Sequence, residues 1–208
     1  MRRSAWIIAV GLVVCVALAG CGGSSSSTAP GSSTSDGKDA EPTASVPEQF
    51  VAIPASGANE KAAVAAVPTA LKAGLELRKG SGQPEPDIGG IDPTFTAYLI
   101  QAVSGNMLVL LEVHADGVAH PLYNPTAPAD ASTVMKQDAS LNSGAILAEP
   151  ASDAEKAAVA AAKTALDSAV PEKDFAIKIL GYRFNYLKDG ESVLQLEINP
   201  DGGVISIS

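Results

Sequence analysis

The sequence predicts an α+β domain made of two tandem units, each a helix followed by a three-stranded antiparallel meander. Residues 60–71 read EKAAVAAVPTAL and residues 155–166 read EKAAVAAAKTAL, with ten of the twelve positions identical. Downstream, GNMLVLLEVHADG at 105–117 aligns with GESVLQLEINPDG at 190–202. The same order of helical and strand patterns in both halves indicates an internal duplication. We therefore expect one domain in which helices pack on a twisted antiparallel sheet.

The first unit is expected at residues 56–122. Its helix carries an apolar stripe at helical spacing, predicted to face the core, that consists of Val64, Val67, Leu71 and Leu75. Pro68 lies inside this helix and should kink or split it. Strands are expected near 95–103, 107–114 and 118–122. Between helix and first strand, the Gly- and Pro-rich stretch 79–93 accounts for about ten residues that the second unit lacks.

The second unit is expected at residues 151–208. Ser152 and Glu155 have the spacing of a capping box at the start of its helix. The stripe predicted to face the core is Val159, Ala162, Leu166 and Val170, and Pro171 should end the helix. Strands are expected at 175–188, 192–198 and 204–208. In the first of these strands the alternation changes phase near Gly181, which predicts a β-bulge there.

The first twenty residues have the pattern of a secretory signal. Arg2 and Arg3 precede an apolar stretch at 5–18, and Leu-Ala-Gly-Cys follows at 18–21. The stretch is too short, and has the wrong flanks, for a membrane span. This motif resembles the lipobox of bacterial lipoproteins, exported proteins whose lipobox cysteine carries a diacylglycerol. The resemblance implies that Cys21 is lipidated and anchors the chain at the extracytoplasmic face of the cell membrane.

Composition separates a tether from a domain. Residues 21–49 are rich in Ser, Gly and Pro and predict a flexible tether spanning about 30 Å. Residues 50–208 are enough for one domain with a hydrophobic core. Cleavage of the signal would leave Cys21 as the one cysteine, which excludes disulfides and thiol catalysis. It would also leave 12 basic residues (14 less Arg2 and Arg3) against 23 acidic ones, so nucleic acid is not an expected partner.

No catalytic motif is evident, and we expect no enzyme activity, no cofactor and no metal site. Glu112 and Glu197 occupy equivalent places in the two halves, on the polar parity of their strands, and are expected at the surface. His114 is expected as a polar residue flanking a turn. Asp87 and Asp92, in the inserted stretch, could contact Ca²⁺ but lack the order of an EF-hand, so solvated loop acids are expected.

Two further features are candidates for binding. Tyr182, Phe184 and Tyr186 form an aromatic row that either packs in the core or lines a cleft between sheet and helices. The connection 123–150 is long for a domain of this size, and it differs between the two halves, as does 79–93. A duplicated scaffold with unequal loops offers an asymmetric binding face.

The order of elements, with the hairpins EVHADG and EINPDGG, is similar to that of the PepSY family and of the tandem helix–sheet repeats of the β-lactamase-inhibitor-protein type. That resemblance implies a non-catalytic binding or regulatory module outside the cytoplasm. We expect this module to engage a protein or peptide through loops or a sheet edge. The alternative is a carrier that holds a lipid or small hydrophobic ligand between sheet and helices.

Overall fold

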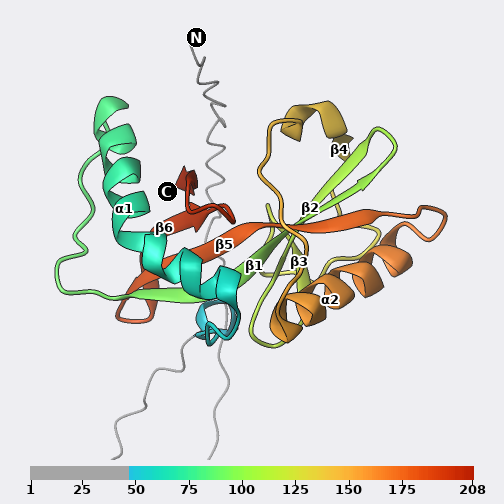
Figure 1. The fold of residues 1–208 in the computed structure, drawn as a ribbon, viewed down its shortest axis with the longest axis horizontal. Coiled ribbons are helices and arrows are strands. Elements are labelled where there is room, and N and C mark those ends of the chain that lie inside the picture. Colours follow the sequence, from blue (N-terminus) through green and yellow to red (C-terminus); the bar gives the residue numbers. More distant parts are fainter. Residues whose placement is uncertain (1–46) are drawn as a thin grey trace, which may run out of the picture. The chain divides into compact units, whose positions relative to one another are not determined.

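The computed structural model describes residues 47–208, so the predicted signal, Cys21 and nearly all of the predicted tether lie outside the described residues. Within them the chain is an α+β domain with two α-helices and one antiparallel sheet, as expected, but the sheet has seven strands rather than the six predicted, because β4 lies in the connection 123–150. Figure 1 shows this arrangement.

The sheet is built around the two longest strands. The strands are β1 (Pro93–Ser104), β2 (Met107–Val113), β3 (Ala119–Pro121), β4 (Gln137–Asp138), β5 (Ala176–Lys188), β6 (Glu191–Ile198) and β7 (Val204–Ile207). Their order is β3-β2-β1-β5-β6-β7, and β4 pairs with β2 outside this path. The central pair β1–β5 is antiparallel, with Tyr98 opposite Tyr182. The long β1–β2 and β5–β6 hairpins turn at Gly105 and Gly190, whose positive φ angles of 57° and 84° suit glycine.

The predicted bulge in β5 is present. Leu99 pairs with Gly181 and Ile100 with Ile179, so Leu180 is the extra residue. A Cβ on Gly181 would lie 2.3 Å from the carbonyl oxygen of Ile198 on β6. The absent side chain is therefore what lets the bulged strand approach β6 closely.

The helices α1 (Ala58–Gly80) and α2 (Asp153–Ala169) pack on one face of the sheet through a common apolar core. In chain order, α1 precedes the first meander but contacts β6 and β7, whereas α2 precedes the second meander but contacts β1, β2 and β3 as well as β5. Figure 1 accordingly shows α1 beside β6 and α2 beside β3. Pro68 does not split α1, which stays continuous, although the helix changes direction along its length (Figure 1).

The buried face of α1 shares Val67 with the predicted stripe but otherwise differs from it. It consists of Glu60, Ala63, Val67, Ala70 and Gly74. Val64, predicted to face the core, is 43% exposed, so that prediction was wrong. The reason is close packing: a Cβ on Gly74 would lie 2.8 Å from Cδ1 of Ile207 on β7, so this face needs small residues. In α2 the buried residues are Glu155, Ala158, Ala162, Leu166 and Ala169, so Ala162 and Leu166 were placed correctly and Val159 is only partly buried.

The connection 123–150 is more structured than a loop. It contains β4 and a short 3₁₀-helix, η2 (Ala139–Asn142), and Ala148 forms a β-bridge with Ile179 of β5.

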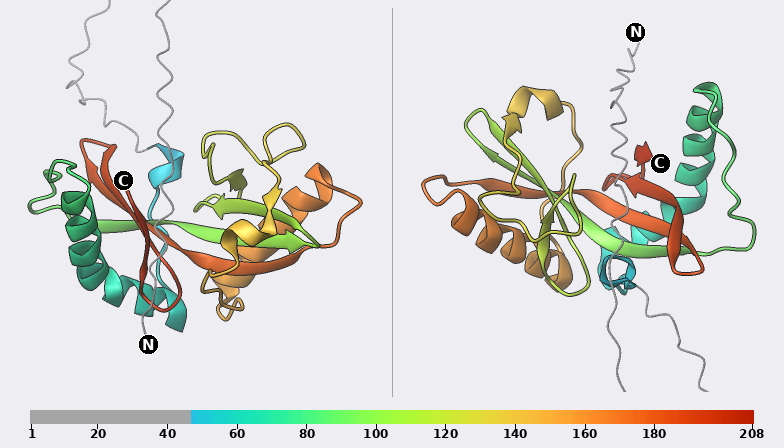
Figure 2. Two further views of the ribbon diagram at one scale, coloured as in Figure 1. Left: turned by 90° about the horizontal axis from the view of Figure 1, so that it is seen from above. Right: turned by 180° about the vertical axis from the view of Figure 1, so that it is seen from behind.

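Another 3₁₀-helix, η1 (Glu48–Phe50), packs against β1. In Figure 2, η1 lies close to the middle of the sheet.

Candidate functional site

Two glutamates cap the helices and meet near the centre of the domain. Glu60 and Glu155 hold the same place in the repeated phrase and the same third position of their helices. Oε2 of Glu155 accepts a hydrogen bond from the backbone N–H of Ser152 at 3.0 Å, and Oε2 of Glu60 accepts one from the N–H of Gly57. The capping box predicted for α2 is therefore present, and α1 carries the equivalent arrangement with glycine at the N-cap.

The second carboxylate oxygens of both glutamates reach the central strands. Oε1 of Glu155 accepts from the hydroxyl of Tyr182 at 2.6 Å, and Oε1 of Glu60 accepts from Tyr98 at 3.0 Å and from Ser152 Oγ at 2.7 Å. Both glutamates are almost completely buried. Burial raises the pKa of Glu60, but hydrogen bonds from Ser152, Gly57 and Tyr98 outweigh it, so its pKa lies below the ordinary value. Burial and the neighbouring carboxylates raise the pKa of Tyr98 and Tyr182. Both oxygens of each carboxylate therefore already accept hydrogen bonds from the protein, which is typical of glutamates that hold helices and sheet together.

A second polar network lies on the sheet face opposite the helices. Arg183 of β5 donates to Glu197 of β6 through Nη2 at 2.8 Å and Nε at 3.2 Å, and its Nη1 lies against Oε2 of Glu112 of β2. Glu112 and Glu197 were expected at the surface, and that expectation was wrong: they are 0% and 7% exposed. The side of the sheet on which they lie was inferred correctly. They are nevertheless buried there, because the guanidinium of Arg183 bridges both carboxylates, and η1 packs against the neighbouring strand β1. The network is a buried ion-pair triad.

Two histidines extend this triad. His114 was expected as a turn-flanking residue, and it does precede the β2–β3 turn, but it is buried and its Nε2 lies 2.6 Å from Oε1 of Glu112. The ring of His120 in β3 stacks on it, with centroids 4.5 Å apart and planes inclined by 19°. His120 Nδ1 donates to the carbonyl oxygen of Ala127 at 3.0 Å. Because a carbonyl only accepts, Nδ1 carries the hydrogen, and in the neutral ring Nε2 presents a lone pair.

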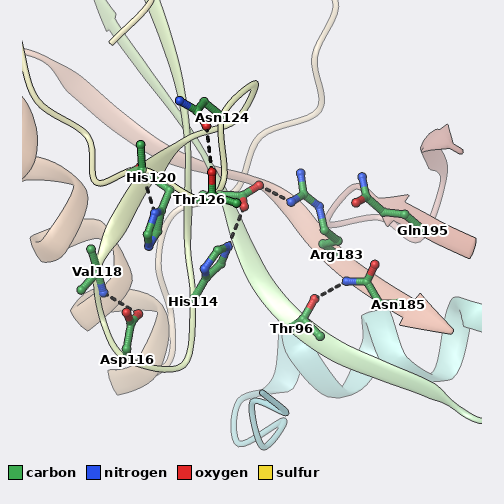
Figure 3. A network of polar contacts seen from close by, with 12 residues as sticks. Thr96, His114, Asp116, Val118, His120, Asn124, Thr126, Arg183, Asn185 and Gln195 are labelled. Atoms are coloured by element: carbon green, nitrogen blue, oxygen red, sulfur yellow. Dashed lines mark hydrogen bonds and ion pairs between the residues drawn. The ribbon is translucent and has the colours of Figure 1, made fainter. Parts of the chain in front are cut away.

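These histidines form part of the wall of a surface pocket of about 300 Å³. Its lining comes from three segments of the chain and consists of Pro47, Glu48, Gln49, His114, Asp116, His120, Pro125 and Thr126. Figure 3 shows His114, His120, Asp116 and Thr126 gathered beside the β2–β3 turn, with Arg183 adjoining. Nε2 of His120 is buried and, within residues 47–208, has no hydrogen-bond partner. His120, which lines the pocket, thus carries an unused acceptor that is itself buried.

The residues singled out in the sequence lie elsewhere. Tyr182, Phe184 and Tyr186 are at most 3% exposed and pack in the core between sheet and helices. Phe95 packs against Tyr182 at a centroid distance of 5.8 Å and against Phe184 at 5.5 Å. These rings fill the interface between sheet and helices, and the pocket beside His120 does not include them.

The two loop acids are exposed and are not part of the pocket. Asp87 pairs with Lys188 at 2.7 Å, and this hydrogen bond and charge lower its pKa. Asp92 precedes Pro93, which is paired with Tyr186; burial and the charge of Asp92 raise the pKa of that tyrosine.

Sequence reasoning missed His120 and Arg183. Arg183 could have been found, because an arginine inside an otherwise apolar alternating strand signals a buried counter-ion. His120 could not, since its importance depends on contacts with Ala127 and with the segment around Glu48, which spacing does not reveal.

No group of three or more His, Cys, Asp or Glu side chains within 47–208 could hold a metal ion. Neither α1 nor α2 has both the length and the apolar character needed to cross a membrane, a statement that concerns the described part of the chain. No protein-family model matches the chain, and neither the curated proteins nor the solved structures contain a match.

Proposed function

We propose that this protein is a non-catalytic binding module for a protein or peptide. The observation that carries the proposal is the buried, unpartnered Nε2 of His120 in the wall of an open pocket. A buried polar atom without a partner costs stability, and a partner whose binding rearranges this wall recovers the cost by supplying the missing hydrogen bond.

The state of the carboxylates supports binding rather than catalysis. Acid–base catalysis needs a group that is free to exchange a proton with a substrate. Glu112 is held by Arg183 and His114, and Glu60 and Glu155 are held by tyrosine hydroxyls and backbone N–H groups. Such hydrogen bonds hold the side chains in fixed positions, and a rigid surface is what binding of a partner requires.

Two observations favour this function over a carrier of hydrophobic ligands. The space between helices and sheet is occupied by packed aromatic side chains, among them Tyr98, Tyr182 and Phe184. Two hollows within residues 47–208 lie elsewhere: one beside His120, and one of about 440 Å³ around the β1–β2 turn at Gly105.

We further propose that the domain is a duplicated helix–meander unit anchored outside the cytoplasmic membrane through a lipid on Cys21. The equivalent capping glutamates, each bonded to a tyrosine of the central strand pair, support the duplication. The lipobox-like motif supports the anchor. Replacing Cys21 by Ser should release the protein from the membrane fraction, and unchanged retention would refute the anchor without touching the binding proposal.

The binding function is tested by site-specific photo-crosslinking in intact cells. A photoreactive amino acid at Thr126, which is exposed at the pocket, should trap a discrete adduct, and the same amino acid at Lys72, exposed on α1, serves as the control. The Thr126 adduct should disappear when His120 is replaced by Asn. Identical adducts from both positions, or an adduct indifferent to His120→Asn, would refute the proposal.

A further inference from the structure

We propose that the stacked rings of His114 and His120 form a pH-sensitive switch, in which uptake of a second proton displaces His120 and releases the pocket wall that it holds. The inference concerns the regulation of the site proposed above. It rests on the proposed binding function for its consequence, but not for the movement itself. It is drawn from the hydrogen bonds of the two rings, the charges around them and the short strand that carries His120.

Each ring has one nitrogen that already holds a hydrogen and one that does not. Nε2 of His114 donates to Oε1 of Glu112 at 2.6 Å, because an ionised carboxylate only accepts. Nδ1 of His120 donates to the carbonyl oxygen of Ala127 at 3.0 Å. An additional proton would therefore occupy Nδ1 of His114 or Nε2 of His120. The two sites differ, because a proton on His114 has Glu112 as its counter-charge, whereas Nε2 of His120 is buried and, among the described residues, has no partner.

The fixed charges around the rings compensate one added proton but not two. Glu112 of β2, Arg183 of β5 and Glu197 of β6 are joined by ion pairs and together leave one negative charge. A proton on His114 balances this charge. A second proton, on His120, would place two like charges on stacked rings (Figure 3) whose centroids are 4.5 Å apart, and its N–H would stay buried without an acceptor. The closed arrangement therefore excludes the second proton.

The remaining charged groups near the rings are exposed. Glu48 of η1 and Asp116 of the β2–β3 turn line the pocket, and both face solvent. They attract protons to the histidines in the closed and in the open arrangement alike, and salt screens them. The segment 125–127 of the connection contributes no charged side chain. Both helices pack on the other face of the sheet. These groups therefore do not remove the difference between the two arrangements.

The strand that carries His120 is short. β3 has only three residues, Ala119–Pro121, and its proline has no N–H to donate. The chain that follows β3 provides Pro125 and Thr126 to the pocket wall, and the hydrogen bond between His120 and Ala127 ties this wall back to β3. When His120 leaves the stack, that bond breaks and the wall is released.

Acid favours the open arrangement. A histidine in contact with water takes up a proton below about pH 6.5. The open arrangement then binds one proton more than the closed one, so opening should become easier by roughly tenfold for each pH unit below this value and should not depend on pH well above it. A protonated His120 also has no lone pair left to accept a hydrogen bond from a partner. We therefore expect the partner to bind at neutral pH and to dissociate in acid.

The test is amide hydrogen exchange of the purified full chain, followed by NMR from about pH 7.5 to about pH 5, a range that brackets histidine titration. The reporters are the amides of Leu122 and Ala129, which form backbone hydrogen bonds to β2 and β3; the control is that of Ala148, bonded to β5. Protection factors, which correct for the direct effect of pH on exchange, should fall roughly tenfold per pH unit at the reporters in acid and stay constant at the control. Reporters that ignore pH, or a fall shared by the control, would overturn the inference.

Two variants assign the effect to the stacked pair. His120→Asn keeps a donor at the position of Nδ1 for Ala127 but removes the site of the second proton, so the reporters should lose their dependence on pH. His114→Gln keeps a donor for Glu112 but removes the neighbouring charge, so the dependence on pH should become shallower. A dependence that survives in the Asn variant, or is unaltered in the Gln variant, contradicts the inference.

Crosslinking from Thr126 in intact cells separates this inference from the binding function. We expect the adduct that forms at about pH 7.5 to be lost at about pH 5.5, on the two sides of histidine titration. An adduct of equal yield at both pH values would show that the switch does not regulate the site, and would overturn that part. If the reporters respond to pH and no adduct forms at either pH, the movement stands and the binding function fails. If the adduct forms and the reporters ignore pH, the switch fails and the binding function stands.

Discussion

Replacing Arg183 by Met tests the buried triad most directly. Arg183 lies between Glu112 and Glu197, and its removal leaves Glu112, which is fully buried, with His114 as its remaining partner. Removing one member of a buried ion pair costs about 3–5 kcal/mol, because the remaining charge stays buried without compensation. For a domain of this size that corresponds to a fall in Tm of roughly 6–20 °C. The free energy of unfolding of a typical domain is only about 5–15 kcal/mol, so this loss would be a large part of the total stability.

A double-mutant cycle identifies the cause. Glu112→Gln removes the charge but keeps an oxygen for His114, so it should cost less alone than Arg183→Met does. In the double variant the buried charge at Glu112 no longer exists, and the effects should be non-additive by about 1–3 kcal/mol. Urea unfolding followed by circular dichroism, with full-length protein, measures each corner of the cycle.

The matched control lies on the surface. Lys163 and Asp167 form an exposed pair on α2 at 2.9 Å, and replacing Lys163 by Met should leave the unfolding midpoint within experimental error. The cost of Arg183→Met should also be nearly the same at low and high salt, because a buried pair is poorly screened. A cost below about 1 kcal/mol, or additive effects in the cycle, would show that the carboxylates are not buried against Arg183.

Three further predictions concern backbone contacts and acid stability. Gly181→Ala should destabilise the domain by more than about 2 kcal/mol in urea unfolding, because the new Cβ would lie 2.3 Å from the backbone oxygen of Ile198; a smaller loss would mean that the bulge can relax. Gly57→Ala should destabilise as well, since its Cβ would lie 2.5 Å from that of Ser152, and adding Ser152→Gly should recover part of the loss; no recovery would contradict this close contact. The lowered pKa of Glu60 means that its contribution to stability is complete above about pH 4.5 and is lost as the pH falls through its folded pKa, so Glu60→Gln should flatten the loss of stability below pH 4.5; an unaltered pH profile would contradict it.

The fold could be predicted largely from local patterns. The alternation in 107–114 and 175–188 located β2 and β5, and the phase change at Gly181 located the bulge, because both are properties of consecutive residues. The buried face of α1 was predicted only in part: Val67 is buried as expected, but an alanine-rich helix has apolar residues on several faces, and most of the positions against the sheet are taken by small residues. Val64 was therefore assigned to the core while Ala63 and Gly74 occupy it.

The candidate site was much harder to predict. Alternation tells which side of a strand a residue lies on, but not whether that side is covered, so Glu112 and Glu197 were assigned to the surface. The pocket joins residues near Glu48, the β2–β3 turn and the connection after it, segments that come together only in the folded chain. His120 owes its free lone pair to a contact with the backbone of Ala127, in the irregular segment after β3, whose path the sequence pattern does not reveal.

The meeting of the two helix caps has an evolutionary consequence. If the two units descend from one, as we propose, the ancestral unit would have paired with a second copy of itself across the equivalents of β1 and β5. An isologous pair places identical residues at both caps, yet serine and a second side chain cannot both fit where Gly57 faces Ser152. Joining the copies in one chain lifts that constraint, because each cap can then mutate alone. Glycine at one helix cap and serine at the other can therefore occur in a single fused chain, whereas a homodimer must carry the same residue at both caps.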